Sequence, residues 1–306
     1  MGQAYFFIAA ERGVLAVGGP DRRAFLQGLI SNDVERITAD RAIHAALLTP
    51  QGRYLHDFFL VEIGETLLID CERARLPELQ KKLTMFKLRS KVTLEDQSAR
   101  WAVAVLWGNA ARTLGLPPEA GSARAVEQGI AYVDPRLAAI GCRAILPAET
   151  ASAALAKAGL AASDQTAWDI HRLSLGIPDG SRDLPVEKAL LLESGFDELN
   201  GVDWNKGCYM GQELTARTKY RGLVRKRLLP VTVEGQMPAP GTLVMLGEKE
   251  AGEMRSGRDG HALALLRLEM VEAANESGPL TAGAARVTAH VPAWVKLPEP
   301  EAKTES

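Results

Sequence analysis

The chain has 306 residues, of which 46% are hydrophobic and 24% are charged, and its formal net charge at pH 7 is −2. This length predicts two domains or one large one, and the slightly acidic balance excludes a protein that binds nucleic acid over its whole surface. Cys71, Cys142 and Cys208 are too few and too far apart for a disulfide scaffold, and without a CxxC pair they exclude a closed zinc site or an all-cysteine iron–sulfur site.

The first 90 residues predict antiparallel sheet with covering helices. A helix begins after Pro20, and a second one is expected at 73–88, with Leu79, Leu83 and Phe86 at helical spacing. No glycine-rich phosphate loop is present, which argues against a βαβ nucleotide-binding fold. The expected strands are short apolar runs separated by turn signals, at 5–9, 14–17, 43–48, 54–62 and 66–70.

The rest of the chain continues in a mixed style and then becomes β-rich. A helix capped by Ser163-Asp164 ends at Gly176, and after Gly222 short β-like runs indicate a small antiparallel barrel or sandwich. The other elements expected before it are strands at 92–94, 101–107, 130–133 and 142–146 and helices at 109–114 and 148–158. The predicted division is an α+β subdomain at 1–90, a second at 91–222, a C-terminal β-barrel at 223–297 and a disordered tail at 298–306.

Targeting and membrane signals are not apparent in the sequence. The first residues lack the pattern of a signal or transit peptide, and no run approaches the roughly 18 apolar residues of a membrane span. We therefore expect a cytoplasmic protein in a reducing compartment, with no membrane partner.

The stretch NKGCYMGQE, residues 205–213, is the least generic part of the sequence. Gly207 and Gly211 bracket Cys208, Lys206 lies two residues before it, and a helix is expected from Gln212. A nearby positive charge and a helix N-terminus both lower the pKa of a cysteine, so the pattern predicts a reactive or metal-facing thiol. The alternative is a small buried cysteine in a turn.

Basic residues follow this thiol closely. Seven lie between 206 and 227, with only Glu213 opposing them, and they predict a local site for phosphate, carboxylate or an RNA backbone. The alternative is a solvated charged face. The seven are Lys206, Arg217, Lys219, Arg221, Arg225, Lys226 and Arg227.

The block at 206–213, followed by Arg217 and Tyr220-Arg221-Gly222, resembles the KGCYxGQE…R…(F/Y)RG signature of the YgfZ-type folate-binding proteins. Those proteins are assembly or maintenance factors for iron–sulfur enzymes and relatives of the aminomethyltransferase (T protein) of the glycine cleavage system. Weaker matches lie at 19–33, at 51–57 and at 172–178. The resemblance covers about residues 10–290 and identifies the chain as a member of this wider group.

The resemblance implies an α+β fold like that of the T protein, with antiparallel sheets around a central channel that binds tetrahydrofolate and a C-terminal β-barrel. It implies that Cys208, Lys206 and Asp57 are the functional residues. Further residues implied for cofactor binding are Tyr209, Gln212, Glu213, Arg217 and Arg221.

The T protein has two acids where this chain has His56-Asp57, so we expect an accessory factor without aminomethyl transfer. Neighbouring side chains on a strand point to opposite faces, so His56 and Asp57 are not expected to line one pocket together. His44 and His171 are expected to be satisfied core or surface histidines rather than ligands.

Three functions remain open from the sequence. The first is a tetrahydrofolate-binding accessory protein for assembly or repair of [4Fe–4S] clusters, in which Cys208 is the reactive thiolate or holds a transient cluster with external ligands. The second is a folate-dependent one-carbon transferase that uses Asp57. The third is an RNA-binding factor in tRNA modification that contacts tRNA through 217–227. The expected partners are folate, iron–sulfur assembly proteins and client iron–sulfur enzymes.

Overall fold

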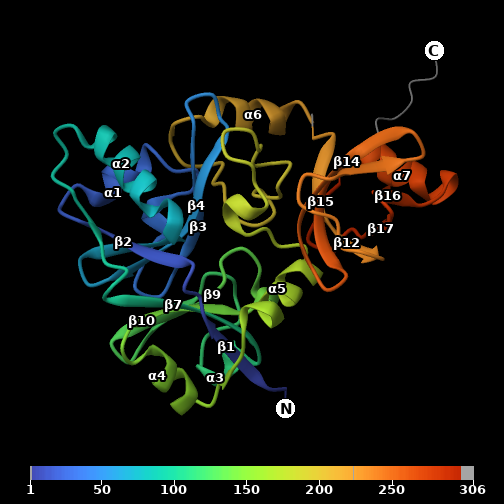
Figure 1. Cartoon of the computed structure of the whole chain (residues 1–306). Helices are drawn as coiled ribbons and strands as arrows, with labels where there is room; N and C mark the ends of the chain where they lie inside the picture. The colour runs from blue at the N-terminus through green and yellow to red at the C-terminus, as the bar shows by residue number, and fades with distance from the viewer. Residues whose placement is uncertain (1, 223, 298–306) are drawn as a thin grey trace.

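The computed structural model describes residues 2–222 and 224–297, and within them two sheets lie face to face beside a closed barrel (Figure 1). Both sheets are antiparallel except for one short parallel pair at an edge of the second. The predicted tail at 298–306 lies outside the described residues. Short 3-10 turns connect several of the elements, at Val34–Arg36, Arg73–Arg75, Ala138–Ile140 and Gly180–Arg182.

The first sheet has five strands, and two helices, α1 (Arg22–Gln27) and α2 (Leu76–Lys87), pack against its outer face. Leu79 and Leu83 of α2 are fully buried there, as their helical spacing predicts. In side-by-side order its strands are β3 (Ile43–Leu48), β4 (Tyr54–Ile63), β5 (Thr66–Glu72), β2 (Arg12–Gly18) and β6 (Thr93–Asp96).

The second sheet has six strands, and its outer face is covered by α3 (Ala110–Thr113) and α4 (Ala151–Lys157). In order, its strands are β11 (Ala161–Ala162), β1 (Ala4–Ile8), β7 (Trp101–Gly108), β10 (Cys142–Pro147), β9 (Gly129–Val133) and β8 (Ala123–Val126). β1 comes before residue 90 but belongs to the second sheet, and β6 comes after residue 90 but belongs to the first. The division of the chain into subdomains at residue 90 stays a prediction.

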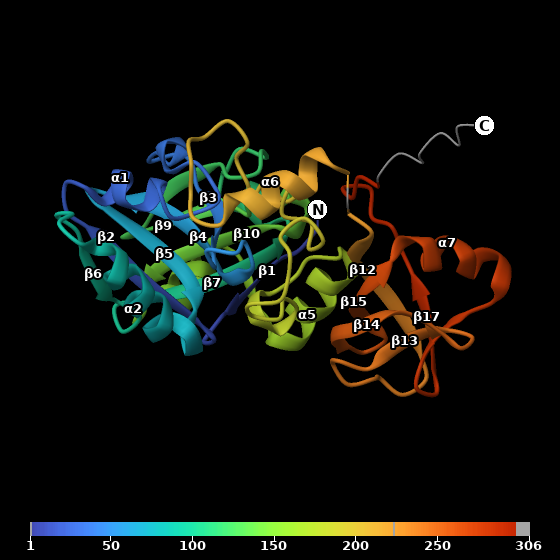
Figure 2. The ribbon, with the colours of Figure 1, turned by 90° about the horizontal axis from the view of Figure 1, so that it is seen from above.

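The two sheets pack against each other (Figure 2). Their inner faces enclose an apolar layer, and charged side chains lie at its centre. Asp70 of β5, which has no solvent exposure, accepts hydrogen bonds from Arg12 of β2 at 2.6 Å and from Arg143 of β10 at 2.7 Å. The guanidinium of Arg143 also lies 4.1 Å from the centre of the Phe59 ring. One carboxylate therefore ties the two sheets together.

The C-terminal barrel is closed, and α7 (Leu268–Ser277) packs on it. Its strands follow the order β12 (Lys226–Glu234), β15 (His261–Arg267), β14 (Lys249–Arg258), β13 (Leu243–Leu246), β16 (Leu280–Ala282) and β17 (Ala285–Ala289). Arg172 of α5 (Gln165–Ser174) fixes it to the rest of the chain, because this buried side chain donates to Asp183 and to Ser256 of β14, both at 2.9 Å.

The structure confirms the antiparallel sheets and the barrel, and it differs from expectation in detail. β8 lies at 123–126, between the helix expected at 109–114 and the strand expected at 130–133, where no strand is expected. Phe86 is 40% exposed although it continues the helical spacing of the buried Leu79 and Leu83.

Replacing Asp70 with Ala is expected to lower the free energy of unfolding by about 3–5 kcal/mol, because two buried guanidinium groups lose their counter-charge. Urea unfolding measures this loss. Glu234→Gln is the control, because its pair with Arg286 is exposed and is expected to change stability by less than about 0.5 kcal/mol. Equal effects of the two substitutions would contradict the role of Asp70.

Candidate functional site

The segment at 203–211 packs against the turn that follows α1 and is hydrogen-bonded to it. The backbone N–H of Asp203 donates to the carbonyl of Ser31, and that of Met210 donates to the carbonyl of Gly28, both at 3.1 Å. Gly211 has a φ of 81° and lies so close to the turn after β3 that a Cβ on Gly52 would meet its carbonyl oxygen at 2.7 Å. The segment is therefore held at both ends.

Lys206 fixes the middle of this segment. Its Nζ donates to three main-chain carbonyls, those of Gln27 at 2.9 Å, Ile30 at 2.7 Å and Asn32 at 2.7 Å. Burial lowers the pKa of Lys206 to about 8, and the charges of Asp33 and Asp203 act in the opposite direction. The side chain predicted to act with Cys208 thus has all three of its donors engaged by the backbone.

Cys208 is exposed, two residues after this anchor. The other two cysteines are buried, Cys71 in β5 and Cys142 at the start of β10, and burial raises the pKa of each of their thiols to about 12. The helix α6 (Gln212–Tyr220) begins four residues after Cys208, as the sequence predicts. The arrangement offers one accessible sulfur on a fixed loop.

The other predicted site residues around Cys208 do not form one pocket. Tyr209 is buried against Leu48 and Tyr54, its backbone N–H donates to Gln212 Oε1 at 3.2 Å, and burial raises its pKa to about 12. Gln212 is half-buried. The predicted cofactor-binding residues that remain are exposed on or just after α6, namely Glu213, Arg217 and Arg221.

The basic stretch at 217–227 is divided between surface and interior. Lys219 pairs with Asp197, and its Nζ lies 4.9 Å from the Trp204 ring. Arg227 is buried and pairs with Glu198 at 2.6 Å. The stretch therefore does not form one continuous anion-binding face. Contact with tRNA stays a prediction.

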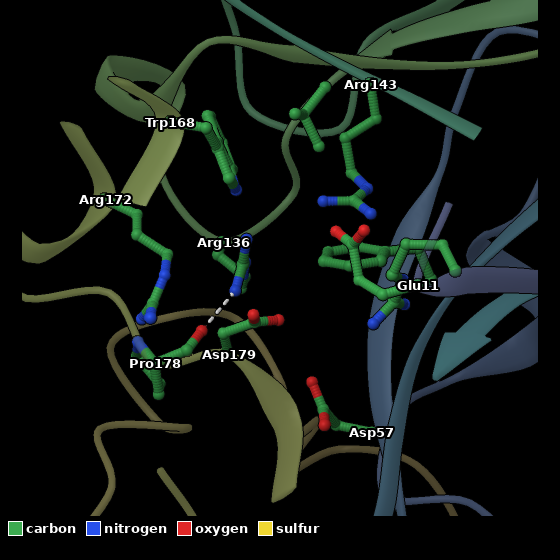
Figure 3. Close-up of a pocket in the computed structure, with 11 residues that line it drawn as sticks. Glu11, Asp57, Arg136, Arg143, Trp168, Arg172, Pro178 and Asp179 are labelled. Atoms are coloured by element: carbon green, nitrogen blue, oxygen red, sulfur yellow. Dashed lines mark hydrogen bonds between the residues drawn. The ribbon is translucent and has the colours of Figure 1, made fainter. Parts of the chain in front are cut away.

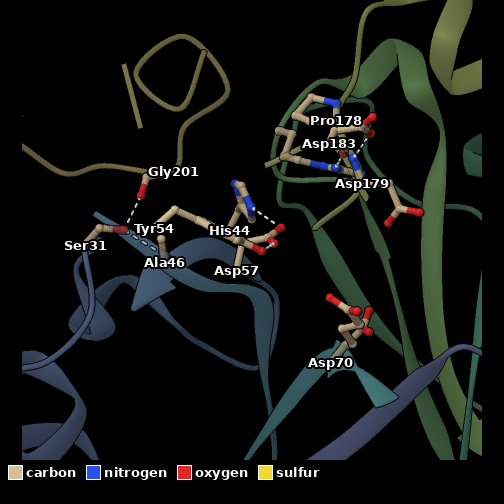
Figure 4. A network of polar contacts seen from close by, with 12 residues as sticks. Ser31, His44, Ala46, Tyr54, Asp57, Asp70, Pro178, Asp179, Asp183 and Gly201 are labelled. Atoms are coloured by element: carbon tan, nitrogen blue, oxygen red, sulfur yellow. Dashed lines mark hydrogen bonds and ion pairs between the residues drawn. The ribbon is translucent and has the colours of Figure 1, made fainter. Parts of the chain in front are cut away.

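Asp57 lies in a separate buried cluster (Figure 4). Its carboxylate accepts from Tyr54 Oη at 2.7 Å, and its Oδ2 lies 3.3 Å from His44 Nε2. Burial opposes the charge of Asp57, but these hydrogen bonds and the charge of Arg12 outweigh it and hold the pKa of Asp57 below its usual range. Burial also lowers the pKa of His44. His44, and not the neighbouring His56, is thus the partner of Asp57, as the alternation along a strand requires.

The cavity between the sheets is where the resemblance places tetrahydrofolate (Figure 3). Four arginines line it, and each is already bonded within the protein, Arg12 and Arg143 to Asp70, Arg136 to Asp134 and Arg172 to Asp183. The free volume is about 10 Å³, room for about one water molecule. A hollow of about 340 Å³ adjoins it beside Glu11 and Asp179.

The enclosed cavity alone is much smaller than a ligand pocket, which has a volume of at least about 300 Å³, whereas the adjoining hollow has that volume. Folate binding stays a prediction. In the described part of the chain, no group of three or more His, Cys, Asp or Glu side chains could hold a metal ion.

The buried arginines are functional candidates that the motif analysis missed. The available signal was a charged residue inside an otherwise apolar strand, as with Asp70 after Leu67-Leu68-Ile69 and Arg143 before Ala144-Ile145-Leu146. A fully buried charge needs a partner of opposite charge, so a charged residue in one apolar strand predicts an oppositely charged residue in another.

Comparison with known proteins gives matches of three kinds, to a family pattern, to named proteins and to a solved structure. The family pattern described as "CAF17, C-terminal beta-barrel domain" matches residues 225–297. The chain is 36% identical to the proteins named "Iron-sulfur cluster assembly factor IBA57, mitochondrial" of Mus musculus and Homo sapiens, over 92% of this chain and 83% of each of theirs. Among solved structures, the glycine cleavage system aminomethyltransferase T from Bartonella henselae is similar, with a TM-score of 0.75, 16% identity and coverage of 96% of this chain and 86% of that one.

The structural similarity confirms the predicted fold class, an α+β T-protein-like fold with a C-terminal barrel. The prediction of a cytoplasmic protein is contradicted, because the names of these relatives place them in mitochondria. The YgfZ-type assignment is confirmed only in its broader form, a relationship to iron–sulfur assembly factors, with a fold like that of the T protein. With 36% identity over most of both chains, this chain belongs to the IBA57 family of iron–sulfur cluster assembly factors.

Proposed function

We propose that this chain supports iron–sulfur cluster assembly by presenting Cys208 as the sulfur that binds a cluster in transit. The observation that carries the proposal is the contrast among its three cysteines, since Cys208 is exposed on a fixed loop and Cys71 and Cys142 are enclosed in the sheets. Relatives at 36% identity are named as assembly factors for such clusters.

The cluster is cargo in this proposal, and a partner supplies its other ligands. A [4Fe–4S] cluster takes one thiolate for each iron, and this chain offers a single accessible thiol. The remaining ligands come from an assembly protein, a client enzyme or glutathione. Cys208 is well placed for this because Gly207 beside it is exposed, and a side chain added there would meet no atom within 4 Å. A partner can therefore approach the sulfur closely.

Lys206 is a positioning residue in this account. Its ammonium is turned to the carbonyls of Gln27, Ile30 and Asn32, so it acts on Cys208 through the loop rather than by direct contact. Three charge-assisted hydrogen bonds from one group keep the loop in the same conformation when a partner binds at the sulfur of Cys208.

The two other functions considered from the sequence receive less support from the geometry. A one-carbon transferase would need Asp57 free to take a proton, whereas both of its oxygens are engaged, by Tyr54 and His44. An RNA-binding factor would need a continuous basic face, whereas Arg227 is buried and Lys219 is paired with Asp197. The exposed cations that remain are Arg217, Arg221 and Arg225.

Thiol labelling tests the accessibility of the three cysteines. We expect Ellman's reagent to modify one thiol per native chain rapidly, because only Cys208 is exposed, and all three in denaturant. The rapid phase should be absent in Cys208→Ser. Two rapid phases, or a rapid phase that persists in that variant, would contradict the structure.

Replacing Cys208 with Ala is expected to abolish function without unfolding the chain. In a strain that lacks the protein, this variant should leave the activities of [4Fe–4S] enzymes at the level of the deletion, while its melting temperature stays within about 2 °C of the wild type. Cys71→Ala is the matched control and should restore the activities, since Cys71 is enclosed in β5. Full restoration by Cys208→Ala would refute the proposal.

Replacing Lys206 with Met is expected to lower the free energy of unfolding by about 2 kcal/mol, because three partly buried carbonyls lose a charged donor. Hydrogen exchange at the amides of Asp203 and Met210 should also become faster, since the loop loses its anchor. Lys219→Met, which removes an exposed pair, should leave exchange at those amides unchanged. The positioning role fails if both variants behave alike.

A further inference from the structure

The end of α2 carries a cluster of large apolar side chains that face solvent. Met85 is 66% exposed, Phe86 is 40% exposed and Leu88, directly after the helix, is 89% exposed. The opposite face of the same helix is fully buried at Leu79 and Leu83. Exposed apolar residues scattered singly are normal, but three within four positions form a patch that needs an explanation.

The backbone at Leu88 has a conformation that side chains of its type avoid. Its φ of 46° and ψ of −111° end the helix at a residue with a branched apolar side chain, where glycine is the usual choice. The side chain gains no packing from this strain, because it is the most exposed of the large apolar side chains in the described ranges. The turn therefore holds an apolar group out in the solvent.

Positive charge surrounds the patch. The stretch from 79 to 94 contains no acidic residue. Glu78, just before this stretch, forms ion pairs with Arg75 at 2.7 Å and Lys82 at 3.8 Å. The carboxylate of Asp21 accepts a hydrogen bond from the backbone N–H of Lys91. In the ranges that the structure describes, no ion pair is formed by the side chains of Lys81, Lys87, Arg89 or Lys91.

We propose that this tip, Lys81 to Lys91, docks the protein on the surface of an anionic lipid bilayer. Met85, Phe86 and Leu88 enter the boundary between headgroups and acyl chains, and the four unpaired cations contact lipid phosphates. α2 lies at the outer edge of the molecule, remote from the barrel, so a flat surface can reach it (Figures 1 and 2).

This is contact with one face of a bilayer and not insertion across it. The expectation of no membrane partner was drawn from spanning segments, and no helix in 2–222 or 224–297 combines the length and apolar character needed to cross a membrane. A protruding tip bordered by cations fits a lipid surface better than it fits an acidic protein. A protein partner would need a complementary area of about 800 Å² on each side, and none of the five hollows described on this structure contains a residue of the tip.

Vesicle co-sedimentation of the full chain tests the proposal. We expect binding to equimolar phosphatidylcholine and phosphatidylglycerol, little binding to phosphatidylcholine alone, and loss of binding as salt is raised. The apolar variant Phe86→Ser/Leu88→Ser and the charge variant Lys87→Glu/Arg89→Glu should each lower the partition coefficient by about tenfold or more.

Two matched controls keep the test specific. Leu243→Ser/Val291→Ser removes two apolar side chains that are 50% and 46% exposed elsewhere, and Lys157→Glu/Lys249→Glu reverses two exposed cations. Both should bind vesicles like the wild type, and circular dichroism should show that all variants fold. The proposal is overturned if the wild type does not bind anionic vesicles, if it binds neutral ones equally well, or if the tip variants bind as the controls do. It is equally overturned if the tip variants still bind anionic vesicles and lose only binding to an acidic protein.

Discussion

The hydrogen bonds from the ammonium group of Lys206 to three main-chain carbonyls are the interaction on which the functional account depends. They join the segment at 203–211 to the turn after α1, two parts of the chain that are more than 170 residues apart in sequence. A cation with three donors and no acceptor suits a cradle of three oxygens, and a neutral side chain of similar length does not. The loop that carries Cys208 thereby has a defined position and leaves the sulfur open to a partner.

The platform beneath this loop is stiffened by buried charge. Asp70 joins Arg12 and Arg143 across the two sheets, and Asp183 joins Arg172 to the barrel. Breaking such pairs is costly because it leaves a charge without a partner in a region that excludes water. These buried ion pairs give the loop that carries Cys208 a rigid support.

Much of the architecture could be predicted from the sequence, because it rests on local signals. Turn residues such as Thr49-Pro50-Gln51-Gly52 lie between β3 and β4 as expected, Asp164 caps α5 as expected, and the short β runs after Gly222 form the barrel. The exposure of Cys208 was also indicated by its polar, glycine-bracketed surroundings. What could not be predicted depends on contacts between distant segments. Examples are the three carbonyls that hold Lys206, the pairing of Asp57 with His44 and the exposure of Phe86 near the end of α2.

X-ray absorption at the selenium edge can show whether the side chain at position 208 binds iron, as we propose for the sulfur of Cys208. Selenocysteine is placed at position 208, and the full chain is incubated without oxygen with ferrous iron, sulfide and glutathione. The account predicts that iron appears in the first coordination shell of selenium. A spectrum in which selenium has only its own carbon as a neighbour, in a sample that demonstrably contains a cluster, would contradict it.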